Sequence, residues 1–369
     1  MSAVVPQAPL CPECNAQMKP ASYGLSMSSD ETDSHINMGC VIGGDLVRFG
    51  CPICGFKIHE SGEIQNPAMY RALASILGLA LGDALGAPYE FKPPVEADVQ
   101  ISMDFDDAWP AGMWTDDTAM AIAIMQAWVK CGTITTPEAQ GELVQIWRDW
   151  SKTAPDCGIQ TRQVLSNLTS GTAEEARDVA RQVHDLNGKS GGNGSLMRTA
   201  PLAFLRLPDE EIAKVVTQVS KLTHFDDDAA HASVIWVFAI RHAIRTEKLD
   251  FTPGLNFIPE SSRAKWQGYL QDASENPPVH FQNNGWVVAA FQAAASAVMI
   301  GQHDFERGLE AAVRAGYDTD TVAAIAGSLL GPLTGLEYLP LDWLEKLHGW
   351  PNFDVEQLAQ LTVETLANA

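Results

Sequence analysis

The chain of 369 residues has few basic side chains for its length, with 24 Lys and Arg against 46 Asp and Glu and a formal net charge of −22. A surface that binds bare nucleic acid needs the opposite balance, so this composition excludes an extended nucleic-acid-binding face. The sequence also lacks a long uninterrupted apolar run, because residues 72–87 are broken by Asp83 and three glycines. We therefore expect no membrane-spanning segment.

Residues 1–10 also lack the pattern of a secretory signal, because they show no charged start followed by an apolar stretch. Seven cysteines without such a signal favour reduced thiols or metal ligands over a disulfide framework. Hydrophobic residues make up 46% and charged residues 19% of the chain, which excludes a mostly disordered protein. We expect a globular cytoplasmic protein.

The first 65 residues differ from the rest in carrying two Cys-x-x-Cys pairs, formed by Cys11, Cys14, Cys51 and Cys54. Four thiolates converging from two tight turns suit tetrahedral zinc, so we predict a zinc-ribbon-like β module with one structural Zn²⁺. Alternatively, Cys40 or His59 replaces one pair member, or the four thiols are unrelated. We expect so small a module to lie outside the helical core and to serve partner recognition.

From Asn66 onward the pattern is helical almost throughout. Apolar residues recur at helical spacing in six segments, residues 68–82, 116–130, 137–150, 226–245, 285–300 and 321–330. Alternating strand patterns are scarce, and the lack of a fixed-period repeat argues against a solenoid. We predict two domains, the β module of residues 1–65 and one large all-α domain of residues 66–369.

Two acidic clusters, residues 115–118 and 318–321, each precede an apolar helical run. Thr and Asp are common helix N-caps, so capping explains either cluster alone. Together the clusters offer four carboxylates and several hydroxyls, which are the hard ligands that Mg²⁺ or Mn²⁺ prefers. We predict that the two helix ends meet and hold a pair of ions.

Between the acidic clusters lie a glycine-rich segment, residues 191–198, and the dipeptide Thr223-His224. Glycines let a ligand approach the backbone and leave amides free for phosphate oxygens, although a plain helix entry explains the segment equally well. A lone histidine before a helix is more often a structural partner than a ligand-binding residue.

Five motifs, in this order, resemble those of the ADP-ribosylglycohydrolases of the dinitrogenase-reductase-activating type: residues 78–90, 112–118, 192–198, 223–224 and 318–321. The resemblance covers about residues 68–335 and leaves the N-terminal module outside it. It implies an orthogonal all-α bundle with two Mg²⁺ or Mn²⁺ ions at the base of an ADP-ribose cleft. Tyr317 departs from the family pattern, which usually has a second glycine at this position.

The resemblance also implies residue roles. The metal ligands would be Thr115, Asp116, Asp117, Asp318, Asp320 and Thr321. The residues that contact ADP-ribose would be Asp83, Asn193, Gly194, Ser195, Met197, His224 and Tyr317. The catalytic carboxylates would be Glu90, Asp117 and Asp318, one of them acting as a general base on water.

The function implied by this resemblance is metal-dependent removal of ADP-ribose from a modified protein side chain, with arginine favoured over serine. An alternative is an immunity protein that neutralises an ADP-ribosyltransferase toxin, both by binding it through the N-terminal extension and by reversing its modification. The acidic residues 30–33 would suit such an interface, or they form a solvated loop. A non-catalytic relative would have no need of all six metal ligands.

Overall fold

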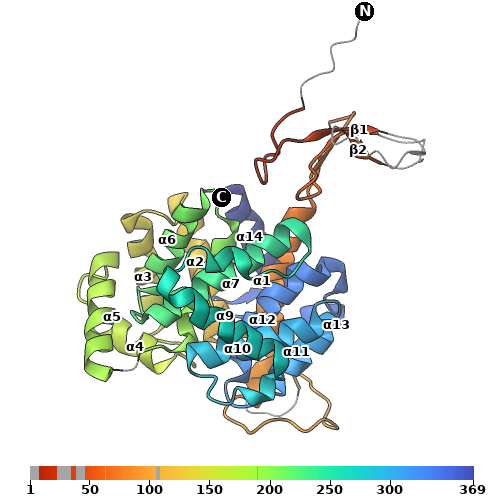
Figure 1. Ribbon diagram of the computed structural model, residues 1–369. Helices are drawn as coiled ribbons and strands as arrows, with labels where there is room; N and C mark the ends of the chain where they lie inside the picture. The colour runs from red at the N-terminus through yellow and green to blue at the C-terminus, as the bar shows by residue number, and fades with distance from the viewer. Residues whose placement is uncertain (1–7, 23–34, 39–45, 63, 105–108, 189) are drawn as a thin grey trace, which may run out of the picture.

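The structure, a computed structural model, describes residues 8–22, 35–38, 46–62, 64–104, 109–188 and 190–369. It consists of a large helical body with a small sheet at one end (Figure 1). Sheet gives way to helix at Asn66, whose side chain caps helix α1 by accepting a hydrogen bond from the Met69 amide. Residues 30–33 and Cys40, which the sequence analysis singled out, lie outside the described residues.

The N-terminal sheet has the strand order β2-β1-β3-β4-β5. Its strands are β1 Lys19–Ser22, β2 Ile36–Asn37, β3 Val47–Gly50, β4 Lys57–His59 and β5 Ile64–Gln65. Neighbouring strands are antiparallel, except that β1 and β2 run parallel. One Cys-x-x-Cys turn precedes β1 and the other joins β3 to β4. This arrangement confirms the predicted β module.

The body is built from α-helices joined by short 3₁₀ helices and loops. Its α-helices are α1 Pro67–Gly86, α2 Asp116–Cys131, α3 Pro137–Trp150, α4 Ile159–Ser166, α5 Ala173–Asn187, α6 Asp209–Ser220, α7 Asp227–Thr246, α8 Thr252–Leu255, α9 Glu260–Glu275, α10 Val287–Gly301, α11 Phe305–Val313, α12 Thr319–Thr334, α13 Leu341–Leu344 and α14 Val355–Ala367. The 3₁₀ helices are η1 Ala87–Tyr89, η2 Asn193–Ser195, η3 Ala200–Phe204, η4 Pro278–His280 and η5 Leu336–Tyr338. A two-stranded hairpin, β6 His348–Gly349 and β7 Phe353–Asp354, precedes α14.

All six segments predicted to be helical are helices, namely α1, α2, α3, α7, α10 and α12. The sequence analysis did not single out α4, α5, α6, α8, α9, α11, α13 or α14. In α5 and α9 the buried stripes are short. Helix α9 buries only Trp266 and Ala273, and α5 buries three alanines and Val183. An amphipathic pattern needs a broad apolar face to stand out from the sequence.

Helix α1 lies directly against α12, and a row of glycines makes this possible. Gly78, Gly82 and Gly86 are four residues apart and therefore share one face of the helix. A Cβ atom at Gly82 would lie 2.0 Å from the Ala323 carbonyl oxygen, and one at Gly86 would lie 2.5 Å from the Asp320 Cα. Without side chains at these positions the two backbones touch. This contact places the beginning of α12 beside the end of α1.

The β module docks at the opposite end of α1, where that helix begins (Figure 1). Its buried residues Met18 and Phe56 belong to the same hydrophobic core as Ala68 and Ala72 of α1. The expectation that the module lies outside the core is therefore wrong. A helix of 20 residues is about 30 Å long, so the module lies about that distance from the end of α1 at Gly86.

The segment Pro67–Tyr89 is long and apolar enough to cross a membrane by length and composition, with a mean hydropathy of 1.3. The interrupted apolar run of residues 72–87 had suggested a shorter apolar segment than this one. Within the structure, however, 94% of the apolar window is buried by the surrounding helices. Its place at the centre of the helical body accounts for its apolar composition.

Candidate active site

Helices α2 and α12 begin next to each other at the end of α1. Thr115 precedes the first residue of α2, and Asp318 precedes that of α12. The Thr115 hydroxyl lies 3.1 Å from Asp117 Oδ2 and 3.4 Å from Asp320 Oδ2. The Thr321 hydroxyl lies 3.4 Å from Asp117 Oδ2. The two acidic clusters thus converge, as the sequence predicted.

Glu90 joins these clusters from the loop that follows η1. Carboxylate oxygens of Glu90, Asp318 and Asp320 all lie within 4.8 Å of one another. Carboxylates this close repel each other unless a proton or a cation lies between them. Oxygen donors of this kind are the ligands that Mg²⁺ and Mn²⁺ prefer.

The electrostatics of the cluster fit a cation. Burial, reinforced by the neighbouring carboxylates, raises the pKa values of Asp116, Asp117 and Asp320 well above their usual range. Burial and then the charge of Asp156 raise the pKa of Glu90 to about 9. In the part of the chain that the structure describes, Oδ1 of Asp117 and of Asp320 are buried without a hydrogen-bond partner. Buried oxygens without a donor are costly, and bound metal ions would supply the missing interaction.

Asp83 lies behind this cluster, fully buried, and does not line the cavity above it. Its Oδ1 accepts hydrogen bonds from the amide and the hydroxyl of Thr115, at 2.9 and 2.8 Å. Its Oδ2 accepts them from the amide and the hydroxyl of Thr118, at 2.9 and 2.6 Å. This arrangement corrects the expectation that Asp83 contacts ADP-ribose. It is a positioning residue that fixes the first turn of α2 to α1.

The glycine-rich segment contains η2 and lines the same cavity as Glu90. Asn193 donates hydrogen bonds to Asp318 Oδ2 and to the Asn284 carbonyl oxygen, both at 2.9 Å. Ser195 is fully buried, and its hydroxyl faces the Ala229 carbonyl of α7 at 3.5 Å. The side chain of Ser195 therefore does not reach the cavity, contrary to its predicted contact with substrate.

His224 packs beneath this segment. Arg198 donates a hydrogen bond to the Thr223 hydroxyl at 2.7 Å, and that hydroxyl lies 2.8 Å from His224 Nδ1. The Thr223 hydroxyl therefore links the Arg198 guanidinium, which can only donate, to the His224 ring. Burial and then the charge of Arg198 lower the pKa of His224 to about 3, so the ring is neutral. It lines the cavity beside Gly194.

A cavity of about 360 Å³ opens above the cluster. The predicted residues that line it are Glu90, Asp116, Asn193, Gly194, Met197, His224, Asp318, Asp320 and Thr321. Thr115 and Asp117 are buried and do not line it. Tyr317 also lies outside the lining, and its φ of 62° is in the left-handed region that favours glycine. This conformation explains why the family pattern usually has glycine there.

Among the residues of the site that the sequence analysis missed are Asp156, Gln160 and Asn284. Asp156 lines the cavity from the segment that leads into α4, and Gln160 lines it from the first turn of α4. Asn284 accepts a hydrogen bond from the Asp318 amide at 3.2 Å and donates one to the Gly316 carbonyl at 2.8 Å. An acid shortly before a helix is the pattern that identified the other clusters, so Asp156 was within reach of the sequence. Asn284 lies in a turn and carries no comparable pattern.

The four cysteines of the N-terminal module also come together. The distances are 3.5 Å from Cys11 Sγ to Cys54 Sγ, 3.4 Å from Cys14 Sγ to Cys51 Sγ and 3.7 Å from Cys14 Sγ to Cys54 Sγ. Four sulfurs placed tetrahedrally around zinc at about 2.3 Å are roughly 3.8 Å apart. The thiols are free and three of them are buried. The cluster therefore has the ligand type, number and spacing of a structural zinc site.

Comparisons with known proteins agree on the family. The family model described as ADP-ribosylglycohydrolase matches residues 65–369. ADP-ribosylarginine hydrolase Tri1 of Pseudomonas putida is 29% identical in an alignment of 306 residues that covers 79% of this chain and 78% of that protein. ADP-ribosyl-[dinitrogen reductase] glycohydrolase of Rhodospirillum rubrum is 26% identical in an alignment of 291 residues that covers 75% of this chain and 90% of the relative.

A solved structure shares the fold as well. It is titled "ADP-ribosylglycohydrolase-related protein complex" and superposes with a TM-score of 0.61 and 25% sequence identity. The match covers 82% of this chain and 98% of the other. The family model spans the helical body and begins where the β module ends. The chain belongs to the ADP-ribosylglycohydrolase family and is an enzyme that hydrolyses ADP-ribosyl linkages.

Proposed function

We propose that this enzyme removes ADP-ribose from arginine side chains of modified proteins with the aid of divalent metal ions. The observation that carries the metal dependence is the meeting of α2 and α12, which gathers buried carboxylates with unpaired oxygens beside Glu90. Arginine as the modified residue is supported by the two relatives named ADP-ribosylarginine hydrolase Tri1, from Pseudomonas putida and Serratia proteamaculans.

Two Mg²⁺ or Mn²⁺ ions would be held by Thr115, Asp116, Asp117, Asp318, Asp320 and Thr321. When bound, such ions orient the hydroxyl groups of the ribose and polarise water. The role of Asp83 is to hold Thr115 in place, and that of Asn193 is to hold the Asp318 carboxylate. A ligand set anchored in this way keeps its geometry when the substrate enters.

The glycine-rich segment would bind the diphosphate of ADP-ribose. Its backbone approaches the cavity closely because Gly192 and Gly194 have no side chains. His224 is neutral, so its ring can form a hydrogen bond to a ligand without adding a charge of its own. Together they would hold the diphosphate while the ribose reaches the carboxylates.

The chemical step replaces the bond between the anomeric carbon and the guanidine nitrogen with a bond to a water oxygen. Positive charge develops on the ribose ring as the carbon–nitrogen bond breaks. Glu90 would take a proton from the attacking water and pass it to the departing guanidine nitrogen, so that arginine leaves as guanidinium and Glu90 is again a carboxylate. Cations bound nearby would lower the pKa of Glu90 from its raised value, because positive charge favours the carboxylate.

The charge around Glu90 supports arginine over serine. Asp156 lies close enough for its charge to be, after burial, the largest cause of the raised Glu90 pKa. A guanidinium leaving group placed between the two carboxylates would relieve this repulsion, whereas a serine hydroxyl would not. Asp156 and Glu90 therefore favour a basic side chain at this end of the cavity.

Hydrolysis of defined substrates tests the proposal. Proteins that carry ADP-ribose on arginine, serine or aspartate are incubated with the enzyme, with Mg²⁺ or Mn²⁺ present or chelated, and released ADP-ribose is measured. We expect release from arginine only, and only with metal. Release from serine with arginine inert would overturn the proposed linkage, and full activity after chelation would overturn the metal dependence.

A further inference from the structure

A second cavity, of about 220 Å³, lies where the β module meets the helical body. Its floor is apolar and buried, and includes Ala68 and Ala72 of α1, Phe204 and Ile244. It is at the beginning of α1, about 30 Å from the end of α1 that carries the catalytic carboxylates. Every step of the proposed hydrolysis takes place without it.

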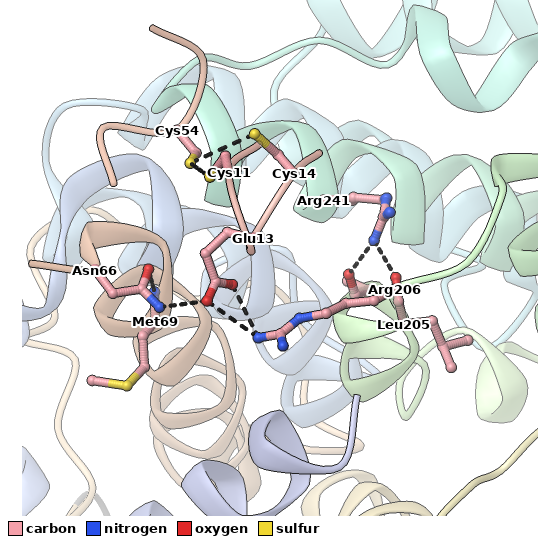
Figure 2. A network of polar contacts seen from close by, with 10 residues as sticks. Cys11, Glu13, Cys14, Cys54, Asn66, Met69, Leu205, Arg206 and Arg241 are labelled. Atoms are coloured by element: carbon pink, nitrogen blue, oxygen red, sulfur yellow. Dashed lines mark hydrogen bonds and ion pairs between the residues drawn. The ribbon is translucent and has the colours of Figure 1, made fainter. Parts of the chain in front are cut away.

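Three arginines, Arg206, Arg241 and Arg245, line the cavity together with Glu13 of the β module. Glu13 accepts hydrogen bonds from Arg206 at 3.1 and 3.2 Å and one from Asn66 at 2.8 Å, so its charge is balanced (Figure 2). Arginines gathered like this are unusual in a chain with a net charge of −22. Positive charge at this rim thus exceeds what the module supplies to balance it.

Arg245 carries this excess, whereas Arg241 has a counter-charge on the body. The Arg241 side chain donates hydrogen bonds to the carbonyls of Ala203 and Leu205, and its Nε is buried without a hydrogen-bond partner among the described residues. Its closest counter-charge is Asp209, at 3.5 Å from that Nε. Half-buried Arg245 has neither ion pair nor hydrogen bond within the described part of the chain, and its charge helps to lower the pKa of Arg241 to about 10.

We propose that this cavity binds a small amphipathic carboxylate, with its apolar body on the buried floor and its charged group at Arg245 and Arg241. The size is suitable, because a cavity of about 150 Å³ holds benzene and this one has room for an apolar body of roughly eight or nine carbons. The first turn of α1 lines the cavity and contains no acidic residue, so its positive helix end also favours an anion. Such a ligand would bridge the module and the body.

Calorimetric titration of the full-length, zinc-loaded protein with straight-chain fatty acids tests this site. We expect binding of one octanoate per chain, with affinity rising roughly fourfold per methylene from butanoate to octanoate and levelling off once the floor is covered. Octanol has the same body without the charge and should bind at least tenfold more weakly. Inorganic phosphate, which has charge without the body, should not compete.

Arg245→Ala is the decisive variant, because this side chain has no partner whose loss would disturb the fold. It should weaken octanoate binding roughly tenfold, while Arg181→Ala, which removes an exposed arginine from α5, leaves the affinity unchanged. Circular dichroism confirms that both variants are folded. No saturable octanoate binding by the wild-type chain, equal affinity of the Arg245→Ala variant, or equal affinity for octanol would each overturn the proposal.

Discussion

The contact between α1 and α12 gives the sharpest structural prediction, through Gly82→Ala. The new Cβ would lie 2.0 Å from the Ala323 carbonyl oxygen and 2.4 Å from its carbon, whereas ordinary contact begins at 3.4 Å. Both atoms belong to helix backbones, so a rotamer change cannot relieve the overlap. The helices must separate by more than 1 Å, and overpacking of this kind costs about 1–3 kcal/mol or more.

The displacement would also reach the active site. Ala323 is three residues, less than one helical turn, from the predicted metal ligand Asp320. A misplacement of about 1 Å in a reacting geometry can cost roughly 100-fold in rate. We therefore expect the rate of hydrolysis to fall together with the free energy of unfolding. Urea unfolding gives the first quantity and the initial rate of ADP-ribose release gives the second.

Gly268→Ala is the matched control. Gly268 lies within α9, and a Cβ there would meet nothing within 4 Å. Alanine is favoured over glycine in an open helix by about 1 kcal/mol, so this variant should be more stable than the wild type and equally active. If Gly82→Ala matched the wild type in both unfolding free energy and rate, the close packing that positions α12 would be refuted.

Four further predictions follow from individual contacts. Asp83→Asn should lower the free energy of unfolding by about 1–3 kcal/mol, because an amide can accept only some of the four hydrogen bonds that Asp83 accepts. A raised KM with unchanged stability would instead show that Asp83 contacts the substrate. Elemental analysis should find one zinc ion per wild-type chain and none in Cys51→Ser, and a full complement in the variant would contradict the Cys₄ site. The pKa of His224 in the folded chain, about 3, lies below its unfolded value, so the unfolded chain binds the extra proton and the free energy of unfolding falls as the pH is lowered from 6 to 4. His224→Gln should reduce this dependence of the unfolding free energy on pH, measured by urea unfolding, by about 1.4 kcal/mol per pH unit. Deletion of residues 1–65 should lower the melting temperature, because Ala68 and Ala72 lose their cover, yet leave hydrolysis of a small arginine-linked substrate intact; a folded but inactive truncation would show that the module shapes the catalytic site.

The positions of six helices and the two acidic clusters at helix starts could be predicted because both depend on local patterns. Asp116 and Asp320 each begin an apolar helix, and the glycine row of α1 is visible in the sequence as a spacing of four. The partners of each side chain could not be predicted. Asp83 is one residue from Gly82, but only the packing of α2 shows that Thr115 and Thr118 take up both of its oxygens.

The docking of the β module depends in the same way on contacts between distant segments. Glu13 reaches Arg206, which is 193 residues away in the sequence, and Arg71 of α1 donates a hydrogen bond to the Cys54 carbonyl at 3.0 Å. No local pattern relates these residues. The small size of the module suggested that it lies outside the core, whereas Phe56 and Met18 extend the core of the body.

In the proposed function, the carboxylates in the first turns of α2 and α12 hold the metal ions on which hydrolysis depends. The most direct measurement is ADP-ribose release from an arginine-linked substrate while Mn²⁺ or Mg²⁺ is titrated into chelator-treated protein, for the wild type and for Asp320→Asn. We predict that the wild type regains activity in a saturable manner, and that the folded variant, which has lost one buried charge from the cluster, needs far more metal or stays inactive. Wild-type activity that does not change with added metal, or an Asp320→Asn variant that follows the wild-type titration, would contradict the assignment of the metal ions to this cluster.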